Sequence, residues 1–246
     1  ARLRRQPYEK QSIVPPPFEG LRDMEFEVGQ IRKLVNWRAF FAVWKLDASF
    51  ARLTEIDGCD HCRAMWLASV PQEQRAKAAE AMQLYKEACR VLDLLNEYKF
   101  KARVVFVKAG SRNEEINYEY NGVEYKLNAP RQRHREGDGY RLSLADFVKP
   151  IEAGEVLGDW IGLFAVTSGR ELQAKIEKFK KEGDDYNAIL YQALADRLVE
   201  AATELMHRSV KRGEAEIRPA IGYPSLPDQR LVFLADGVLN YAQLNI

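Results

Sequence analysis

The stretch INYEYNGVEYKL, residues 116–127, constrains the fold of this chain more than any other part of it. Asn121-Gly122 is a pair preferred in type I′ turns, which join antiparallel strands, because both residues tolerate positive φ. Apolar and polar residues alternate on either side, so one face of each strand is predicted to be buried. The preceding ARVVFVKAG, residues 102–110, is apolar enough for a buried strand. We therefore predict an antiparallel sheet in this region.

Helical periodicity precedes this predicted sheet. From about Glu25 the apolar spacing is helical and leads into NWRAFFAVWKL, residues 36–46, whose aromatic side chains require burial. A second helix has capping residues at 69–72 and an apolar stripe that continues to about Tyr98. The N-terminal part of the domain is therefore predicted to be helical, whereas residues 1–22, with three consecutive prolines, are predicted to be a linker or N-terminal arm.

A strand and two more helices are predicted after the hairpin. The apolar run within DWIGLFAVTSG, residues 159–169, predicts an interior strand. Helices follow at 171–182 and 185–212, each ended by a glycine. These patterns together predict an α+β fold, with a central, mainly antiparallel, twisted sheet flanked by helices and a helical N-terminal region.

Composition narrows the classes of function. The chain is 46% hydrophobic and 30% charged, with a net charge of +1 and no basic stripe, so nucleic acid is not predicted as a partner. No apolar run approaches the roughly 20 residues of a membrane-spanning helix, so no membrane partner is predicted. The three cysteines are too few for a disulfide framework, and the first residues do not resemble a secretory signal. We expect a cytoplasmic protein.

The sequence CDHC, residues 59–62, has two interpretations. Two thiolates and His61 could bind zinc, but a tetrahedral structural site needs a fourth ligand. A redox Cys-x-x-Cys normally opens a helix after a strand, whereas this one follows Asp57-Gly58. We predict a loop with reduced thiols and no metal site.

The common catalytic motifs do not occur in the sequence. There is no phosphate-binding Walker loop, no Gly-x-Gly-x-x-Gly and no His-Glu-x-x-His. His134 and His207 have no serine or cysteine in a nucleophile-elbow context, so solvated or capping roles are expected for both. We predict no catalytic residues.

The segment IRPAIGYPSLPDQ, residues 217–229, combines stiffness with one flexible position. Its three prolines exclude a helix interior and a central strand, so an extended course along a surface is predicted. Gly222 allows a ligand to approach the backbone or allows positive φ, and Arg218 has a planar guanidinium suited to a carboxylate. Tyr223 adds a flat face and a hydroxyl. The alternative is a proline-rich connector, since residues 224–227 also match the PxxP pattern.

Three carboxylates follow one another at four-residue spacing in the predicted helix 185–212. Asp196, Glu200 and Glu204 share one face, and like-charge pairs at this spacing each cost roughly 0.2–0.5 kcal/mol. The face is either a solvated acidic surface, offset in part by Arg208, or a surface directed at a cationic ligand or partner. Spacing alone leaves both interpretations open.

Several of these stretches, taken together, resemble one known family, the activation domain of cobalamin-dependent methionine synthase. NWRAFFAVWKL is similar to that family's Trp-x-x-Phe-Phe entry helix. LADFVKP, DWIGLFAVTSG, GDDYNAILYQALADRLVEAATELMH and IRPAIGYPSLPDQ follow in the family's order. The resemblance covers roughly residues 25–230, and the domain is predicted to occupy residues 23–246.

The resemblance implies a binding site for S-adenosylmethionine. In that family the Arg-Pro-x-x-Gly-Tyr stretch lines a shallow groove at the sheet edge, and the matching positions here are Arg218, Ala220, Gly222 and Tyr223. Two acids of the family's long helix are matched by Glu200 and Glu204.

This sequence departs from the family pattern in two places. The family usually has an aspartate that contacts the cofactor just before the entry-helix tryptophan, and Asn36 stands there instead, so weaker binding of the cofactor's cationic end is expected. The family also continues beyond the final YAQLNI, so we expect either a fragment truncated at the C-terminus or a shortened variant.

The implied function is reductive reactivation as a module of a methyltransferase. The domain would bind S-adenosylmethionine while oxidised cob(II)alamin, carried by a separate cobalamin-binding module, is reduced by a flavodoxin-like or flavoprotein donor and methylated. No Asp-x-His-x-x-Gly corrinoid motif occurs here, and this fragment alone is not expected to be catalytic. One alternative is a stand-alone accessory protein that binds S-adenosylmethionine or a corrinoid protein outside methionine synthase. The other is a purely structural fragment.

Overall fold

The computed structural model describes residues 13–56, 59–132, 141–152, 157–211 and 217–244. The chain divides into two compact units, and neither is continuous in sequence. The first unit takes the described residues within Ala1–Asp23, Arg103–Ala165 and Arg208–Leu244. The second takes those within Met24–Ala102 and Val166–His207.

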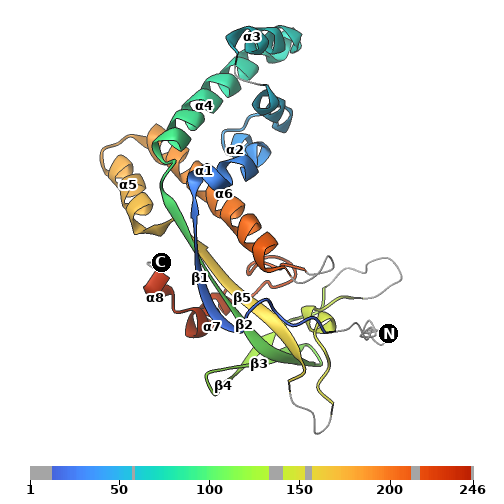
Figure 1. Cartoon of the computed structure of the whole chain (residues 1–246). Coiled ribbons are helices and arrows are strands. Elements are labelled where there is room, and N and C mark those ends of the chain that lie inside the picture. The colour runs from blue at the N-terminus through green and yellow to red at the C-terminus, as the bar shows by residue number, and fades with distance from the viewer. Residues whose placement is uncertain (1–12, 57–58, 133–140, 153–156, 212–216, 245–246) are drawn as a thin grey trace. The chain divides into compact units, whose positions relative to one another are not determined.

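The described residues form strands, α-helices and short 3-10 helices (Figure 1). The strands are β1 Gly20–Glu27, β2 Lys99–Arg112, β3 Glu115–Tyr120, β4 Val123–Asn128 and β5 Asp159–Thr167. The α-helices are α1 Val28–Ile31, α2 Trp37–Val43, α3 Asp60–Ser69, α4 Arg75–Leu94, α5 Gly169–Lys181, α6 Asp185–Val210, α7 Leu231–Leu239 and α8 Tyr241–Leu244. The 3-10 helices are η1 Arg32–Leu34, η2 Ala48–Glu55, η3 Gln72–Gln74 and η4 Leu144–Phe147.

The sheet has the order β1-β2-β3-β4, and β5 also pairs with β2. The pairs β2–β3 and β3–β4 are antiparallel, and Tyr120 lies opposite Val123 at the turn. Asn121 and Gly122 have φ of 52° and 75°, as a type I′ turn requires. The predicted hairpin and the α+β class are confirmed, with a mainly antiparallel sheet and helices beside it.

The core of the first unit lies between the sheet and helix α7. Buried side chains of β2, β3 and β4, including Val107 and Tyr118, form one cluster with Leu231, Ala235 and Val238 of α7. Helix α7 follows the proline-rich segment directly, so burial of its apolar face fixes where that segment ends. Helices α7 and α8 were not predicted from the sequence, because the chain after residue 229 is short and the α7 sequence is apolar on most sides.

A buried arginine ties the end of α7 to the strands. The Arg103 guanidinium binds both carboxylate oxygens of Asp23, at 2.6 and 2.8 Å. Its remaining donors reach the carbonyls of Leu239 and Asn240, at 2.8 and 3.2 Å. Those carbonyls belong to the last turn of α7, where backbone acceptors have no partner within the helix. The pKa of Arg103 is raised, chiefly by its hydrogen bonds to Asp23.

The second unit is built on aromatic packing between α2 and α4. Phe40 and Phe41 are fully buried, and the Trp37 ring stands edge-on to Tyr85 of α4, with centroids 4.8 Å apart. Helix α5 is held at its start by Tyr98, whose hydroxyl donates to the Ser168 carbonyl at 2.8 Å and accepts from the Leu172 amide at 3.1 Å. The predicted burial of the aromatic helix is confirmed for its two phenylalanines.

Three predictions about these elements need correction: two concern boundaries and one concerns burial. Strand β1 begins at Gly20 and runs to Glu27, so the chain is extended where the helical pattern and the end of the arm were predicted. Strand β5 is present, but most of its side chains are partly exposed, so it is not the fully interior strand that its apolar run predicted. The helix at 185–212 is present as α6 Asp185–Val210, and Gly213 lies outside the described residues.

Candidate functional site

The proline-rich segment belongs to the first unit and changes course half-way. Residues 217–220 form no helix, strand or turn, whereas residues 221–226 fold into consecutive turns and bends. The Gly222 amide donates to the Leu226 carbonyl at 2.7 Å, and the Leu226 amide donates to the Tyr223 carbonyl at 2.8 Å. The prediction of an extended course throughout was therefore wrong, because these proline residues also suit turn positions. We call residues 217–230 the C-terminal loop.

One buried side chain anchors the C-terminal loop and leaves its turn exposed. Leu226 is 6% exposed and belongs to the core cluster formed by the sheet and α7. Gly222 is exposed and has φ of +90°, and a Cβ built there would meet nothing closer than Gln229 Cγ at 3.7 Å. Glycine is thus required by backbone conformation, not by crowding.

The other predicted residues of this loop are also accessible. Arg218 and Ala220 are exposed, and Tyr223 is 64% exposed. The tyrosine ring is therefore available as a flat apolar surface with a hydroxyl at its edge. The structure brings these three residues and Gly222 together on one short stretch, as their spacing required.

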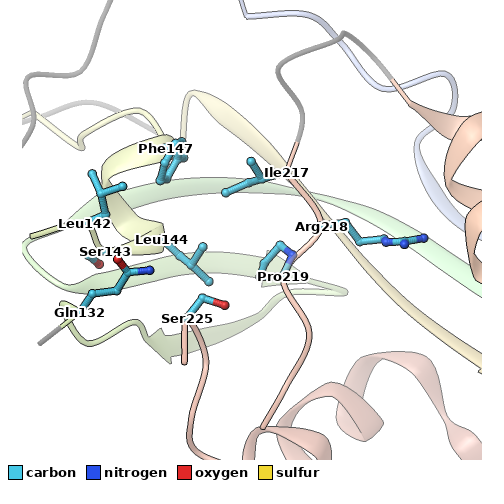
Figure 2. Close-up of a pocket in the computed structure, with 9 residues that line it drawn as sticks. All are labelled: Gln132, Leu142, Ser143, Leu144, Phe147, Ile217, Arg218, Pro219 and Ser225. Atoms are coloured by element: carbon cyan, nitrogen blue, oxygen red, sulfur yellow. The ribbon is translucent and has the colours of Figure 1, made fainter. Parts of the chain in front are cut away.

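A hollow of about 260 Å³ lies beside residues 217–219 of the loop (Figure 2). It is lined mainly by apolar groups, from Gln132, Leu142, Ser143, Leu144, Phe147, Ile217, Arg218, Pro219 and Ser225. In Figure 2 the Arg218 side chain extends away from the other labelled residues. The Arg218 guanidinium and the apolar hollow thus lie on different sides of the backbone of residues 217–219 (Figure 2).

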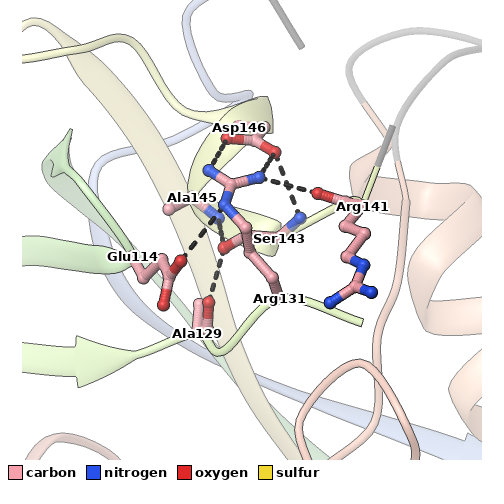
Figure 3. Close-up of polar contacts among 7 residues, drawn as sticks. All are labelled: Glu114, Ala129, Arg131, Arg141, Ser143, Ala145 and Asp146. Atoms are coloured by element: carbon pink, nitrogen blue, oxygen red, sulfur yellow. Dashed lines mark hydrogen bonds and ion pairs between the residues drawn. The ribbon is translucent and has the colours of Figure 1, made fainter. Parts of the chain in front are cut away.

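A buried ion-pair cluster supports the wall of this hollow (Figure 3). Arg131 binds both carboxylate oxygens of Asp146, at 2.6 and 2.8 Å, and donates to the Arg141 carbonyl at 2.8 Å. Asp146 also accepts from the Ser143 amide at 3.1 Å, which completes a capping box on η4. Hydrogen bonding to Asp146 raises the pKa of Arg131, against the effect of burial. Glu114 contacts the same guanidinium at 3.1 Å.

Two predicted site residues belong to the second unit, where each has a local partner. The Asn36 side-chain oxygen accepts from the Ala39 amide at 3.1 Å and so caps the first turn of α2. Glu200 on α6 pairs with Arg197 one turn earlier at 3.2 Å, and its side chain is 54% exposed. The Asn36 side-chain oxygen therefore already accepts a local hydrogen bond that stabilises the start of α2.

The acidic face of α6 is less uniform than its spacing indicates. Asp196 accepts from Gln192 at 2.8 Å, while Glu200 has its arginine partner. Neighbouring donors on the same helix thus offset part of the like-charge repulsion. These contacts match the interpretation of a solvated surface, and they leave Glu200 accessible to a ligand as well.

Comparison with known proteins gives the family. A profile described as "Vitamin B12 dependent methionine synthase, activation domain" matches residues 27–243. The chain belongs to this family. The activation domain is also similar to a solved structure described as the crystal structure of the MetH reactivation domain bound to AdoHcy. The two share 27% identity, with a TM-score of 0.76, over 95% of this chain and 74% of that one.

The CDHC sequence of this activation domain lies at the start of a helix, which corrects the predicted loop. Cys59 is the N-cap of α3, and its sulfur accepts from the Cys62 amide at 3.1 Å. The preceding Asp57-Gly58 suggested a loop, but a polar turn before an N-cap is an equally common context. Within the described residues, no group of three or more histidine, cysteine or acidic side chains could hold a metal ion.

The two histidines have different outcomes. His134 lies outside the described residues of the activation domain. His207 is on α6, and its Nε2 atom is buried with no hydrogen-bond partner among the described residues. The expectation of a solvated or capping histidine was therefore wrong for His207.

Sequence reasoning missed the Arg131–Asp146 cluster of the activation domain. Ser143-Leu144-Ala145-Asp146 has the spacing of a capping box and could have indicated η4 in advance. Nothing in the local sequence points to Arg131 as the partner.

In the part of the chain that the structure describes, no helix is long and apolar enough to cross a membrane.

Proposed function

We propose that this chain is the S-adenosylmethionine-binding reactivation module of a cobalamin-dependent methionine synthase. Membership of the activation-domain family supports this, and so does the similarity to a reactivation domain bound to AdoHcy, the product left when S-adenosylmethionine gives up its methyl group. The observation that carries the proposal is the C-terminal loop, in which Arg218, Gly222 and Tyr223 are exposed and Leu226 is the buried anchor.

The groups of this loop fit the chemistry of the methyl donor. Arg218 has a guanidinium that can bind a methionine carboxylate through two parallel hydrogen bonds. The Gly222 amide is already bonded to Leu226, so we assign ligand contacts to carbonyl oxygens of residues 220–222, each of which can accept two hydrogen bonds. Tyr223 offers a flat face for the adenosine part. The anchor at Leu226 holds these groups in place before binding, which lowers the entropic cost.

The chain's task in the reaction is positioning. When bound, S-adenosylmethionine supplies an electrophilic methyl carbon, and cobalamin carried on a separate module supplies the nucleophile. The residues of this chain therefore bind and orient the donor and exclude water, without moving a proton. We propose that this supports reductive methylation of oxidised cob(II)alamin, with one electron from a flavodoxin-like or flavoprotein donor. The fragment by itself is not proposed to be catalytic.

Calorimetric titration with S-adenosylmethionine tests the proposal. We expect Arg218→Ala to weaken binding by roughly 10- to 150-fold, since loss of a charge-assisted hydrogen bond costs about 1.5–3 kcal/mol. Arg218→Lys keeps the charge and is expected to recover only part of the affinity. Arg230→Ala is the matched control, because Arg230 lies in the same loop, is exposed and pairs with Asp228 at 2.8 Å. Equal affinities for the wild type and Arg218→Ala would remove Arg218 from the site.

Asn36 and Glu200 are proposed as further polar contacts to the donor, each with its own test. Asn36→Asp keeps an acceptor for the Ala39 amide and adds the charge usual in the family, so affinity is expected to rise several-fold without loss of stability. Glu200→Gln removes a charge at constant size, and Asp196→Asn one turn earlier is its control. If both helix variants bind alike, the acidic face of α6 has no specific role in binding.

An activation assay distinguishes the reactivation module from the alternative, a stand-alone accessory protein. We expect the chain to support methylation of a cobalamin module from methionine synthase, given a reduced flavoprotein. Binding of S-adenosylmethionine together with failure of that assay would favour the accessory role.

A further inference from the structure

The CDHC sequence on α3 has no part in the proposed function, and its geometry indicates a separate chemistry. Cys59 occupies the N-cap position, with extended φ and ψ of −89° and 139°, and Cys62 lies three residues into the helix. This places both side chains on the same side of the first turn. Their Sγ atoms are 2.8 Å apart, and both residues are exposed. The two sulfurs thus need only a small rotation to reach bonding distance.

We propose that Cys59 and Cys62 form a reversible dithiol–disulfide pair that exchanges with small disulfides of the glutathione class. A redox Cys-x-x-Cys normally opens a helix after a strand; here the pair does open a helix, α3, which follows the 3-10 helix η2 in the chain. A tetrahedral metal site would need more ligands than the two thiols, and no set of three or more occurs in the described residues. Two accessible thiols in contact are sufficient for thiol–disulfide exchange.

The surroundings give the two sulfurs different roles. The Cys59 sulfur accepts a hydrogen bond from the Cys62 amide at the helix N-terminus, where the backbone favours negative charge. The pKa of Cys62 is raised, first by its hydrogen bond with Cys59. Because the Cys59 sulfur accepts from the Cys62 amide, Cys59 is the attacking thiolate, and Cys62 is the resolving thiol.

The exchange balances in two steps. The Cys59 thiolate attacks one sulfur of the small disulfide, breaks its S–S bond, forms a mixed disulfide and releases one small thiolate, which takes up a proton. The Cys62 thiol then loses its proton and attacks Cys59 Sγ, which releases the second small thiol and closes the Cys59–Cys62 bond. The protein loses two electrons and two protons, and the small disulfide becomes two thiols.

The third cysteine supplies an internal control. Cys89 lies half-buried on α4, and burial raises the pKa of its thiol. It is therefore expected to react slowly with the same disulfide and to remain a free thiol.

The test is equilibration of the full chain in buffers of varied ratio of reduced to oxidised glutathione. The thiols are then blocked by alkylation and the peptides mapped by mass spectrometry. We expect a Cys59–Cys62 disulfide that appears and disappears reversibly with the ratio, while Cys89 stays alkylated. Cys62→Ser is expected to accumulate a mixed disulfide at Cys59. In Cys59→Ser, the Cys62 thiol is expected to react more slowly than the Cys59 thiol does in Cys62→Ser, because the Cys59 sulfur accepts from the Cys62 amide at the helix N-terminus.

Folding itself is checked in the same experiment. Circular dichroism of each serine variant should match the wild type, because both positions are exposed. In urea, the unfolded chain should lose the rate difference between Cys59 and Cys62. Mixed disulfides on both cysteines with no internal bond at any ratio would overturn the proposal, as would equal rates for the two serine variants in the folded chain.

Discussion

Replacement of Asp146 by asparagine is expected to destabilise the first unit more than any surface substitution. The Arg131 side chain is 9% exposed and the Asp146 side chain 1%, and two hydrogen bonds of 2.6 and 2.8 Å join them. Asparagine keeps the shape and can still accept from the Ser143 amide, but the buried guanidinium loses its buried carboxylate partner and keeps the more exposed Glu114, at 3.1 Å. Breaking one partner of such a pair costs about 3–5 kcal/mol.

A double-mutant cycle separates the pair from its surroundings. Arg131→Met alone removes the guanidinium that neutralises the buried Asp146 carboxylate, so it too is expected to cost about 3–5 kcal/mol. The double variant leaves neither charge and is expected to cost much less than the sum, with a coupling energy of about 2–3 kcal/mol. The remaining loss reflects the Arg141 carbonyl, which loses its donor at 2.8 Å.

The assay is urea unfolding followed by circular dichroism, with the transition midpoint and slope fitted for each variant. The exposed pair Asp228–Arg230, at 2.8 Å, is the reference cycle and is expected to show no measurable coupling. A coupling energy for Arg131 and Asp146 below about 0.5 kcal/mol would refute the reasoning, because the buried pair would then interact no more strongly than an exposed ion pair.

The remaining predictions concern one backbone position and two tyrosines. Gly222→Ala places a Cβ at φ of +90° and should strain the C-terminal loop by about 1–2 kcal/mol, seen as weaker S-adenosylmethionine binding in calorimetry and faster amide exchange in the loop. Burial raises the pKa of Tyr118 to about 12, above its unfolded value of about 10, so its contribution to stability is complete below pH 10 and is lost as the pH rises toward 12. Tyr118→Phe should flatten that alkaline loss in urea unfolding. Tyr98→Phe removes the hydroxyl between Ser168 and Leu172, at a cost of about 1–3 kcal/mol, and should increase hydrogen exchange at the start of α5.

The sequence was most informative where structure depends on neighbouring residues. The turn at Asn121-Gly122 needs two residues that accept positive φ, and both do so. The end of α5 was predicted for the same reason, since Gly183 has φ of +73°. The start of α3 was missed because Asp57-Gly58 suggested only a turn, although the cysteine beyond it acts as the N-cap.

The candidate site was predicted in part. The spacing of Arg218, Gly222 and Tyr223 places them on one exposed stretch in any conformation of the loop. Its folded turn was not predicted, because it depends on Leu226 entering a core whose strands are about a hundred residues earlier in the chain. The N-cap hydrogen bond of Asn36 on α2 was not predicted from the sequence.

By itself, the sequence determined the hairpin, the long helices, the family resemblance and which side chains stand in the C-terminal loop. The hairpin, the helices and the composition of the loop depend on residues within a few positions of one another, and the family resemblance depends on several such stretches in a fixed order. Only the tertiary structure decided that Arg131 pairs with Asp146, that Arg103 holds the end of α7 from a distant strand, and that Leu226 anchors the loop. The physical reason is that buried charges and core side chains pair with residues that are distant in the sequence and that the fold brings together. Short-range sequence periodicity does not specify those pairs.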